Sequence, residues 1–325
     1  MARHADPFNP NPQGSSNPGT GTPSIAFLPS PTDELAAAVR EGGGVVEPLS
    51  DATAGLVLSD VVSASEVAKV LAAHPGIRWI QLYLAGVDQY DALMRSNPTR
   101  KWTSGKGAFG QPVGEFAITL TLAMLRGVPT FARASSWGPP RGTSLQDRNV
   151  VLVGAGGVGS EILRLLQAFT EHITVVRAHD RPVPGAERTV TDAGMDEVLA
   201  TADVVILAAA LTAGTDHLMD ARRLALLKPE AFLINVSRGP TVDTDALVQA
   251  LAGGKLAGAA LDVTDPQPLP DGHPLWSEPR ALITPHTAET PEMVAPLLAR
   301  RVRENVRRFA AGEPLEGLVN VDEGY

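Results

Sequence analysis

A glycine-rich turn constrains the fold of this chain more than any other feature of the sequence. The apolar run NVVLVGA ends in glycines of the pattern G-x-G-x-x-G, and the helical segment SEILRLLQAF follows directly. Glycines alone could serve only tight packing, but the order of strand, glycines and helix is typical of a dinucleotide-binding turn. Such a turn brings the helix N-terminus to a pyrophosphate. The predicted site comprises Gly154, Gly156, Gly157, Val158 and Gly159.

Positive charge after the next predicted strand favours a dinucleotide with a phosphate on the ribose 2′-oxygen. An acidic residue about 20 positions beyond the glycines holds the ribose 2′-hydroxyl of NAD, whereas an arginine there suits the 2′-phosphate of NADP. Arg177 stands 18 residues after Gly159, and Arg181 is close behind. We therefore predict NADP(H) in preference to NAD(H). In the NAD(H) alternative, Asp180 binds the ribose.

Six apolar runs in the second half of the chain predict a parallel sheet. Continuous apolar strands that alternate with helices indicate a sheet covered on both faces. The runs span residues 149–155, 172–178, 203–210, 231–237, 258–263 and 281–286. Such sheets bind their ligands at the carboxyl ends of the strands.

The first half predicts a smaller α/β unit. We expect strands at 24–30, 53–60 and 77–86, and helices at 32–43 and 63–76. A long helix is expected from about Val113 to residue 135, and its apolar character on more than one face favours burial at an interdomain or subunit interface. Residues 1–22, which are rich in Asn, Pro, Gly and Ser, are expected to form a disordered tail.

Composition excludes several classes of partner and site. With 325 residues the chain suits two domains. Its formal charge of -9, without a basic block, makes nucleic acid and anionic membranes poor partners. The absence of cysteine excludes disulfides and thiolate zinc sites, and no metal site is predicted. No apolar run is long enough to span a bilayer, so we expect a soluble, cytoplasmic protein.

Polar residues that could bind a substrate or transfer a proton follow the last three predicted strands. Arg238, the segment 262–267 and His286 follow these strands and should converge where a nicotinamide would lie. A guanidinium offers a planar fork to a carboxylate or carbonyl oxygen, and an imidazole is a general acid or base. The other histidines lie in the tail or at the ends of elements and are weaker candidates. They are His4, His74, His172, His179, His217 and His273.

From Ser24 to Tyr325 the chain resembles the D-isomer-specific 2-hydroxyacid dehydrogenases. The motifs that carry the resemblance are LAGVD, VGAGGVG, LTAGTDHLM, INVSRGPTVDTDALVQAL, GAALDV, HPLW and TPH. The resemblance implies an α/β fold of two domains, with a Rossmann-type doubly wound parallel sheet inserted in a smaller flavodoxin-like substrate domain. The substrate domain would comprise 23–112 and 291–325, and the dinucleotide-binding domain 113–290. A homodimer built around the long helix is also implied.

The same resemblance implies reversible hydride transfer between NAD(P) and a small 2-keto acid such as glyoxylate, hydroxypyruvate or pyruvate. In this scheme His286 protonates the developing alkoxide, and Arg238 binds the substrate and stabilises its negative charge. Asp262 would contact the nicotinamide carboxamide. The backbone amides of Leu84, Ala85 and Gly86 would hold the substrate carboxylate. Further cofactor-binding candidates are Ala209, Thr215 and Val236.

Gln267 departs from the charge pattern that the resemblance implies. It stands immediately before Pro268, where most of the family has a glutamate that pairs with the catalytic histidine. A neighbouring carboxylate raises the pKa of a histidine by roughly 1 to 3 units, whereas an amide can accept a hydrogen bond but brings no charge. We therefore expect a less basic His286 and keto-acid reduction at a more acidic pH. Asp265 and Glu289 are the residues that could replace the missing charge.

Two alternative functions follow from related proteins. Formate dehydrogenases of this family resemble the chain in having glutamine in a Pro-Gln-Pro turn, although their longer N-terminal portion and asparagine-bearing substrate loop are missing before YLAGVD. Relatives that act as NAD(H)-sensing corepressors suggest a non-catalytic binding protein. The retention of Arg238, His286 and all the fingerprint glycines favours the enzyme.

Overall fold

The computed structural model describes residues 21–321, which form two compact units. The first unit extends to Ala108 and resumes at Pro291, and the second is Phe109–Thr290. The predicted tail falls almost wholly outside the described residues. The first turn of the long helix packs in the second unit, since a Cβ at Gly110 would lie 2.7 Å from the carbonyl oxygen of Gly157. The boundary between the units therefore precedes the predicted residue 113.

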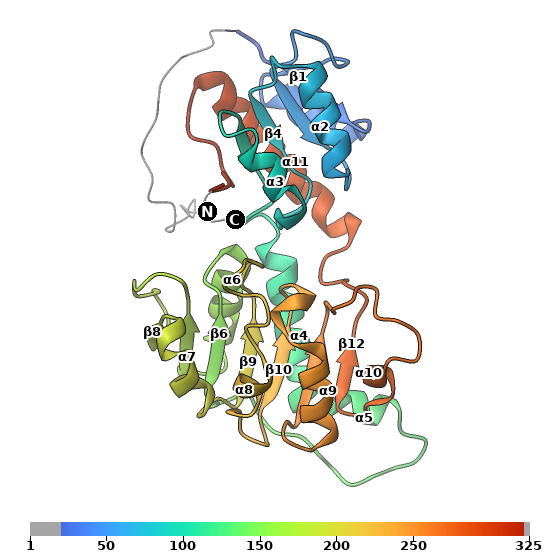
Figure 1. Ribbon diagram of the computed structural model, residues 1–325, viewed down its shortest axis with the longest axis vertical. Helices are drawn as coiled ribbons and strands as arrows, with labels where there is room; N and C mark the ends of the chain where they lie inside the picture. Colours follow the sequence, from blue (N-terminus) through green and yellow to red (C-terminus); the bar gives the residue numbers. More distant parts are fainter. Residues whose placement is uncertain (1–20, 322–325) are drawn as a thin grey trace. The chain divides into compact units, whose positions relative to one another are not determined.

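The second unit contains a seven-stranded parallel sheet in the order β12-β11-β10-β9-β6-β7-β8 (Figure 1). This order is doubly wound, with the topological switch between β6 and β9, as expected for the Rossmann-type domain. The strands are β6 (Val150–Val153), β7 (Ile173–Val176), β8 (Arg188–Val190), β9 (Val204–Leu207), β10 (Phe232–Asn235), β11 (Gly258–Leu261) and β12 (Ala281–Ile283). All residues of β6, β9 and β11 are buried, which explains their continuous apolar sequences.

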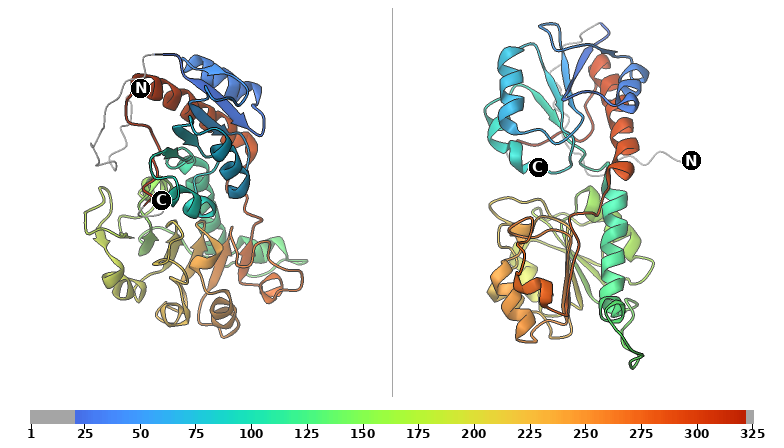
Figure 2. Two further views of the ribbon diagram at one scale, coloured as in Figure 1. Left: turned by 45° about the horizontal axis from the view of Figure 1, so that its top comes forward. Right: turned by 90° about the vertical axis from the view of Figure 1, so that its right-hand side faces the viewer.

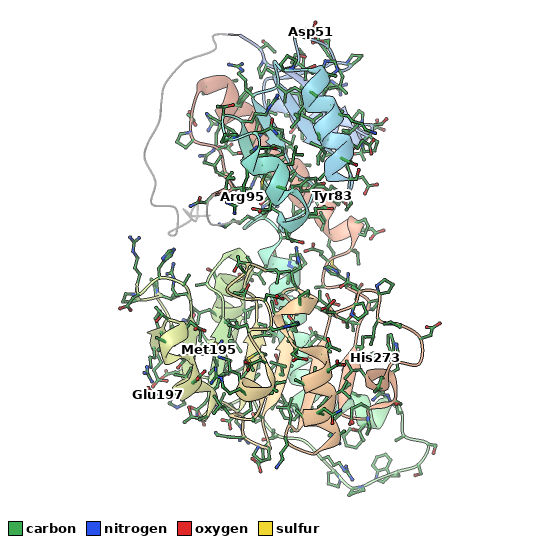
Figure 3. The ribbon with its side chains drawn as sticks, viewed as in Figure 1. Asp51, Tyr83, Arg95, Met195, Glu197 and His273 are labelled. Atoms are coloured by element: carbon green, nitrogen blue, oxygen red, sulfur yellow. The ribbon has the colours of Figure 1, made fainter. Side chains whose placement is uncertain are left out.

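Helices cover both faces of this sheet. The long helix α4 (Gly110–Leu125) packs along α6 (Gly157–Leu166) on one face, and α9 (Thr244–Ala252) lies on the other (Figure 2). The remaining helical elements are α5 (Val128–Ala132), α7 (Asp192–Leu199), α8 (Ala221–Leu224), η2 (Gly239–Thr241) and α10 (Pro274–Ser277). On α7, Met195 is fully buried, whereas Glu197 binds Arg188 of the edge strand β8 at the surface (Figure 3).

The prediction of one helix from about residue 113 to 135 was wrong. The helix begins at Gly110 and ends at Leu125. Gly127 then adopts a φ of +66°, which interrupts the helical backbone, and Pro129 lies in the first turn of α5. A proline is well tolerated in a first turn, where its missing N–H is not needed, but not within a continuing helix.

The first unit contains a five-stranded parallel sheet in the order β2-β1-β3-β4-β5. This is the flavodoxin-like order, as expected for the smaller domain. The strands are β1 (Ser24–Leu28), β2 (Val45–Val46), β3 (Gly55–Leu58), β4 (Trp79–Gln81) and β5 (Lys101–Thr103). α1 (Asp33–Glu41) and α11 (Pro291–Ala311) pack together on one face, and α2 (Ala64–Ala73) covers the other (Figure 2). Two short elements, η1 (Asp88–Tyr90) and α3 (Asp91–Arg95), precede β5.

None of the helices between residues 21 and 321 combines the length and apolar character that crossing a bilayer requires.

Candidate active site

The turn after β6 has the backbone geometry of an anion-binding site. Gly154 has a φ of +106°, and a Cβ there would lie 2.7 Å from the backbone of Ala208. A Cβ at Gly159 would lie 2.1 Å from the carbonyl oxygen of Gly154. Both positions therefore require glycine. At Gly156 the space around a Cβ is open, and α6 begins without a side-chain N-cap. The residues present thus fit a dinucleotide pyrophosphate.

The other cofactor-binding candidates surround this turn at the carboxyl ends of β7, β9 and β10. Arg177 is the first residue after β7 and is half-buried, and Arg181 is exposed. The Thr215 hydroxyl accepts a hydrogen bond from the Thr212 N–H at 2.8 Å and donates one to the Ala210 oxygen at 2.7 Å, so it stabilises the loop after β9. Val236 donates its N–H to the Leu207 oxygen at 3.2 Å. The backbone N–H of Ala209 lies beside Gly154.

Three neighbouring strands bring Arg238, Asp262 and His286 to one edge of the sheet. β10, β11 and β12 are paired in register, with Asn235 opposite Leu261 and Leu261 opposite Ile283. Arg238 and His286 each stand three residues beyond their strand, and Asp262 follows β11 immediately. The structure therefore places the three side chains on adjacent strand ends, where ligands of such sheets bind.

Asp262 clamps the loop that carries His286. Its carboxylate is 2% exposed and accepts hydrogen bonds from the Thr284 hydroxyl at 2.5 Å and from the N–H groups of Thr287 and Ala288 at 2.9 and 3.0 Å. Its backbone oxygen accepts the His286 N–H at 2.9 Å. His286 adopts a φ of +52°, a left-handed conformation that costs a non-glycine residue about 1 kcal/mol or more. The clamp holds His286 in this conformation.

Gln267 contacts His286 directly. The sequence led us to expect that its amide accepts a hydrogen bond from the ring, but in the structure the amide donates one. Gln267 Nε2 lies 2.8 Å from His286 Nδ1, so the amide donates and the ring nitrogen accepts. A neutral imidazole with its proton on Nε2 satisfies this arrangement. For an imidazolium, the amide must turn to present Oε1 to the Nδ1 proton. A carboxylate at this position could only accept, and would therefore favour the charged ring.

Gly239 fixes the position of the turn that carries Gln267, a role that the sequence did not reveal. A Cβ at Gly239 would lie 1.9 Å from the carbonyl oxygen of Thr264 and 2.7 Å from the Asp265 nitrogen. The turn therefore packs directly on the backbone that follows Arg238. The Thr244 hydroxyl donates to the Asp265 oxygen at 2.8 Å and holds the turn from the other side. The glycine after Arg238 is the only sequence signal of this packing.

Arg238 and Glu289 form the charged part of the site with Asp262. Arg238 is half-buried and donates from Nη1 to the Ser237 oxygen at 2.8 Å. Burial raises the pKa of Glu289, the Arg238 charge opposes that rise, and the Asp262 charge adds to it. The charges of Arg238 and Asp262 thus act on Glu289, while Gln267 contacts the histidine.

The loop Leu84–Gly86 lies in the first unit, between β4 and η1, and its three residues are half-buried. The Leu84 oxygen accepts the Gly105 N–H at 2.9 Å, and the Leu82 N–H donates to the Thr103 oxygen at 2.7 Å. Behind it, the buried Gln81 side chain donates to the Leu82 oxygen at 2.9 Å. These bonds tie the loop to β5 and its following segment.

The other described histidines have local or surface contacts. His273 caps α10, with Nδ1 accepting the Leu275 N–H at 3.3 Å (Figure 3). His172 lies 3.2 Å from Glu187 at the surface. Within residues 21–321, no group of three or more His, Asp or Glu side chains could hold a metal ion.

Known proteins resemble this chain over most of its length. A family model for the NAD-binding domain of D-isomer specific 2-hydroxyacid dehydrogenases matches residues 118–288. An uncharacterized protein of Corynebacterium melassecola is 37% identical over 301 residues, which cover 90% of this chain and 97% of that protein. The glyoxylate reductase of Thermofilum pendens is 32% identical over 267 residues, 78% of each chain. A D-isomer specific 2-hydroxyacid dehydrogenase of Xanthobacter autotrophicus, solved with NADPH and MES, has a TM-score of 0.79 and 27% identity, and the match covers 94% of this chain and 100% of that chain.

Proposed function

The chain belongs to the D-isomer-specific 2-hydroxyacid dehydrogenase family, and on that premise we propose that it reduces a small 2-keto acid with NADPH. It is an oxidoreductase with an NAD(P)-binding domain. The observation that carries the proposal is that Arg238 and His286 follow the carboxyl ends of β10 and β12, the two strands that flank β11. The relative from Thermofilum pendens, named glyoxylate reductase, supports a substrate such as glyoxylate, hydroxypyruvate or pyruvate.

Each site residue has a defined task in the proposed reaction. When bound, the reduced nicotinamide supplies the hydride. His286, as an imidazolium, donates its Nε2 proton to the carbonyl oxygen as negative charge develops there. Arg238 stabilises that charge, and the amides of Leu84, Ala85 and Gly86 hold the substrate carboxylate. Asp262 keeps the histidine loop in place and lies beside the proposed nicotinamide site.

Gln267 can serve both protonation states of His286. After Nε2 has donated its proton the neutral ring keeps the proton on Nδ1, which Gln267 Oε1 accepts. The arrangement in the structure, in which Nδ1 accepts from Gln267 Nε2, fits the other neutral tautomer, whose proton is on Nε2. Before donation Nδ1 carries a proton, and the turned amide presents Oε1 to it. A residue without charge therefore orients the ring throughout the cycle but stabilises the imidazolium less than a carboxylate would.

A spectrophotometric screen tests the proposed function. We expect glyoxylate, hydroxypyruvate or pyruvate to oxidise NADPH faster than NADH. Formate with NADP+ or NAD+ is the matched control for the Gln267–His286 pair, and little turnover is expected. Faster oxidation of formate than reduction of any keto acid would contradict the proposal. Binding of NADPH without turnover of any substrate would instead favour a sensor.

Arg177 and Arg181 are proposed to select NADPH. Charge-assisted hydrogen bonds contribute about 1.5 to 3 kcal/mol each, so the double substitution Arg177→Ala and Arg181→Ala should raise the KM for NADPH at least about tenfold. The KM for NADH should change little. Arg188→Ala, which removes the surface pair with Glu197, is the control. Unchanged NADPH kinetics in the double variant would refute this assignment. Weakened NADH binding after Asp180→Ala would favour the NAD alternative.

We also propose that the enzyme is a homodimer assembled around α4 and α5. In support, α5 exposes the apolar side chains of Val128 and Phe131, 50% and 42% of whose surfaces are accessible. The surplus of acidic over basic residues supports the proposal that nucleic acid and anionic membranes are not partners. We also propose that the enzyme works in the cytoplasm, whose reducing conditions suit a sequence without cysteine.

A further inference from the structure

Arg301 is a buried arginine of α11 whose guanidinium binds backbone oxygens of the first unit. Its side chain is 9% exposed. Nη1 donates to the Ser104 oxygen at 3.1 Å, and Nη2 donates to the Lys106 oxygen at 3.0 Å. The Glu316 carboxylate lies 3.6 Å from Nε. Burial of a guanidinium costs free energy unless the group is hydrogen-bonded, so these acceptors keep Arg301 in place.

The contact between Arg301 and Ser104 is enclosed by a glycine near the end of the chain. Gly317 has a φ of +65°, and a Cβ there would lie 2.0 Å from Arg301 Nη1 and 2.5 Å from the Ser104 oxygen. The Ser104 N–H donates to the Gly317 oxygen at 2.9 Å. Only a residue without a side chain therefore leaves room for the guanidinium at the Ser104 carbonyl.

Two peptide groups connect Arg301 to the loop that is proposed to hold the substrate carboxylate. The Ser104 oxygen, which accepts from Arg301, belongs to the same peptide group as the Gly105 N–H. That N–H donates to the Leu84 oxygen at 2.9 Å, and this oxygen shares its peptide group with the Ala85 N–H. Every cis bond among residues 21–321 precedes a proline, so both groups are trans and each N–H points away from its carbonyl oxygen. Hydrogen bonds therefore run without a break from the buried guanidinium to the peptide that carries the Ala85 N–H.

The Ala85 N–H is available to a ligand. Ala85 is half-buried, and its N–H donates to no acceptor in the part of the chain that the structure describes. In a chain of hydrogen bonds each peptide group polarises the next. A positive charge at the carbonyl end of this chain makes the last N–H a stronger donor, which favours an anionic acceptor.

We propose that Arg301 is a positioning residue for the substrate carboxylate, because it fixes and polarises the peptide that carries the Ala85 N–H. This inference rests on the proposed function, in which the loop Leu84–Gly86 holds that carboxylate. Arg301 then acts on the carboxylate of the substrate rather than on its keto group. It should therefore favour 2-keto acids over neutral carbonyl compounds of the same shape.

A keto acid and its methyl ester distinguish this role from a general structural one. The acid is the one that the wild type reduces fastest among glyoxylate, hydroxypyruvate and pyruvate. We expect Arg301→Met to lower kcat/KM for the acid about tenfold or more, mainly through KM, since hydrogen bonds to charged groups are the stronger ones. For the neutral ester the loss should be about threefold or less. The KM for NADPH should stay unchanged, because the cofactor-binding candidates belong to the second unit.

Arg100→Met is the matched control. Arg100 also donates from two guanidinium nitrogens to backbone oxygens, those of Ile77 and Leu71. Ile77 precedes β4, so these bonds lie at the amino end of the strand whose carboxyl end leads to the loop. Each substitution leaves two carbonyl oxygens without their donors and should lower the Tm. Only Arg301→Met should lower the ratio of kcat/KM for the acid to kcat/KM for the ester.

Arg301→Lys keeps the positive charge but donates from one nitrogen, so the acid-to-ester ratio should fall less than in Arg301→Met. If Arg301→Met does not fold, the comparison of Arg301→Lys with Arg100→Lys gives the same test. Equal losses for acid and ester, or an equal fall of the ratio in the Arg100 variant, would overturn the role of Arg301 and leave the proposed function intact. A wild type that reduces none of the three keto acids would overturn the proposed function itself.

Discussion

Replacing Asp262 by asparagine is expected to lower kcat for keto-acid reduction about a hundredfold or more and the free energy of unfolding by about 2 kcal/mol. The carboxylate accepts from donors on both oxygens: Thr284 and Thr287 on Oδ1, and Ala288 on Oδ2. An amide has one acceptor, so its NH2 would face an N–H donor. The loop would move and His286 would leave its left-handed conformation. Stopped-flow kinetics and denaturant unfolding measure the two effects.

Two further substitutions distinguish the effect of Asp262 on the position of His286 from its effect on the stability of the fold. Asp203→Asn removes a carboxylate that likewise accepts a backbone N–H, from Asn149 at 2.9 Å, at the amino end of the sheet. It should lower stability without lowering kcat. Thr284→Val removes only the hydroxyl donor and should cost about 1 kcal/mol. Equal losses of kcat in Asp262→Asn and Asp203→Asn would show that the clamp has no special effect on His286.

The second large effect is expected from Gln267→Glu. The new carboxylate would lie in hydrogen-bond contact with His286 Nδ1, where Gln267 Nε2 now lies at 2.8 Å. An adjacent carboxylate stabilises the imidazolium and raises the histidine pKa by about 1 to 3 units. Keto-acid reduction requires the protonated ring, so the pH at which kcat declines should rise by the same amount. The reverse reaction, which requires the neutral ring, should be slowed near neutral pH.

The fold was largely predictable because its strands are either fully buried or joined by clear helical segments. The runs that became β6, β9 and β11 are apolar throughout, and the glycine pattern appears where β6 meets α6. Elements that escaped prediction are short and lie at or near sheet edges. β8 contains only Arg188–Val190, and Val190 alone of its residues is buried. Such strands have too few buried residues to show a period.

The composition of the site was predictable, but its geometry was not. Strand ends in a parallel sheet meet at one edge, which is why Arg238 and His286 could be placed together from sequence. The clamp by Asp262 depends on a backbone that turns left-handed at His286, and no residue type signals that conformation. The direction of the Gln267 hydrogen bond depends on which protonation state of the imidazole it meets. Long-range packing, such as that of Gly239 against Thr264, leaves only a glycine in the sequence and does not identify the partner.

The pH dependence of kcat at saturating keto acid and NADPH, in the wild type and in Gln267→Glu, tests the account most directly. At saturation the profile reports groups in the enzyme–substrate complex, and therefore His286 in that complex. We expect wild-type kcat to decline as pH rises through about 6.5 or below, and the decline to move upward by about 1 to 3 pH units in Gln267→Glu. His286→Gln should lack this decline. A wild-type decline well above neutrality, or the same midpoint in both enzymes, would contradict the claim that an uncharged partner governs the catalytic histidine.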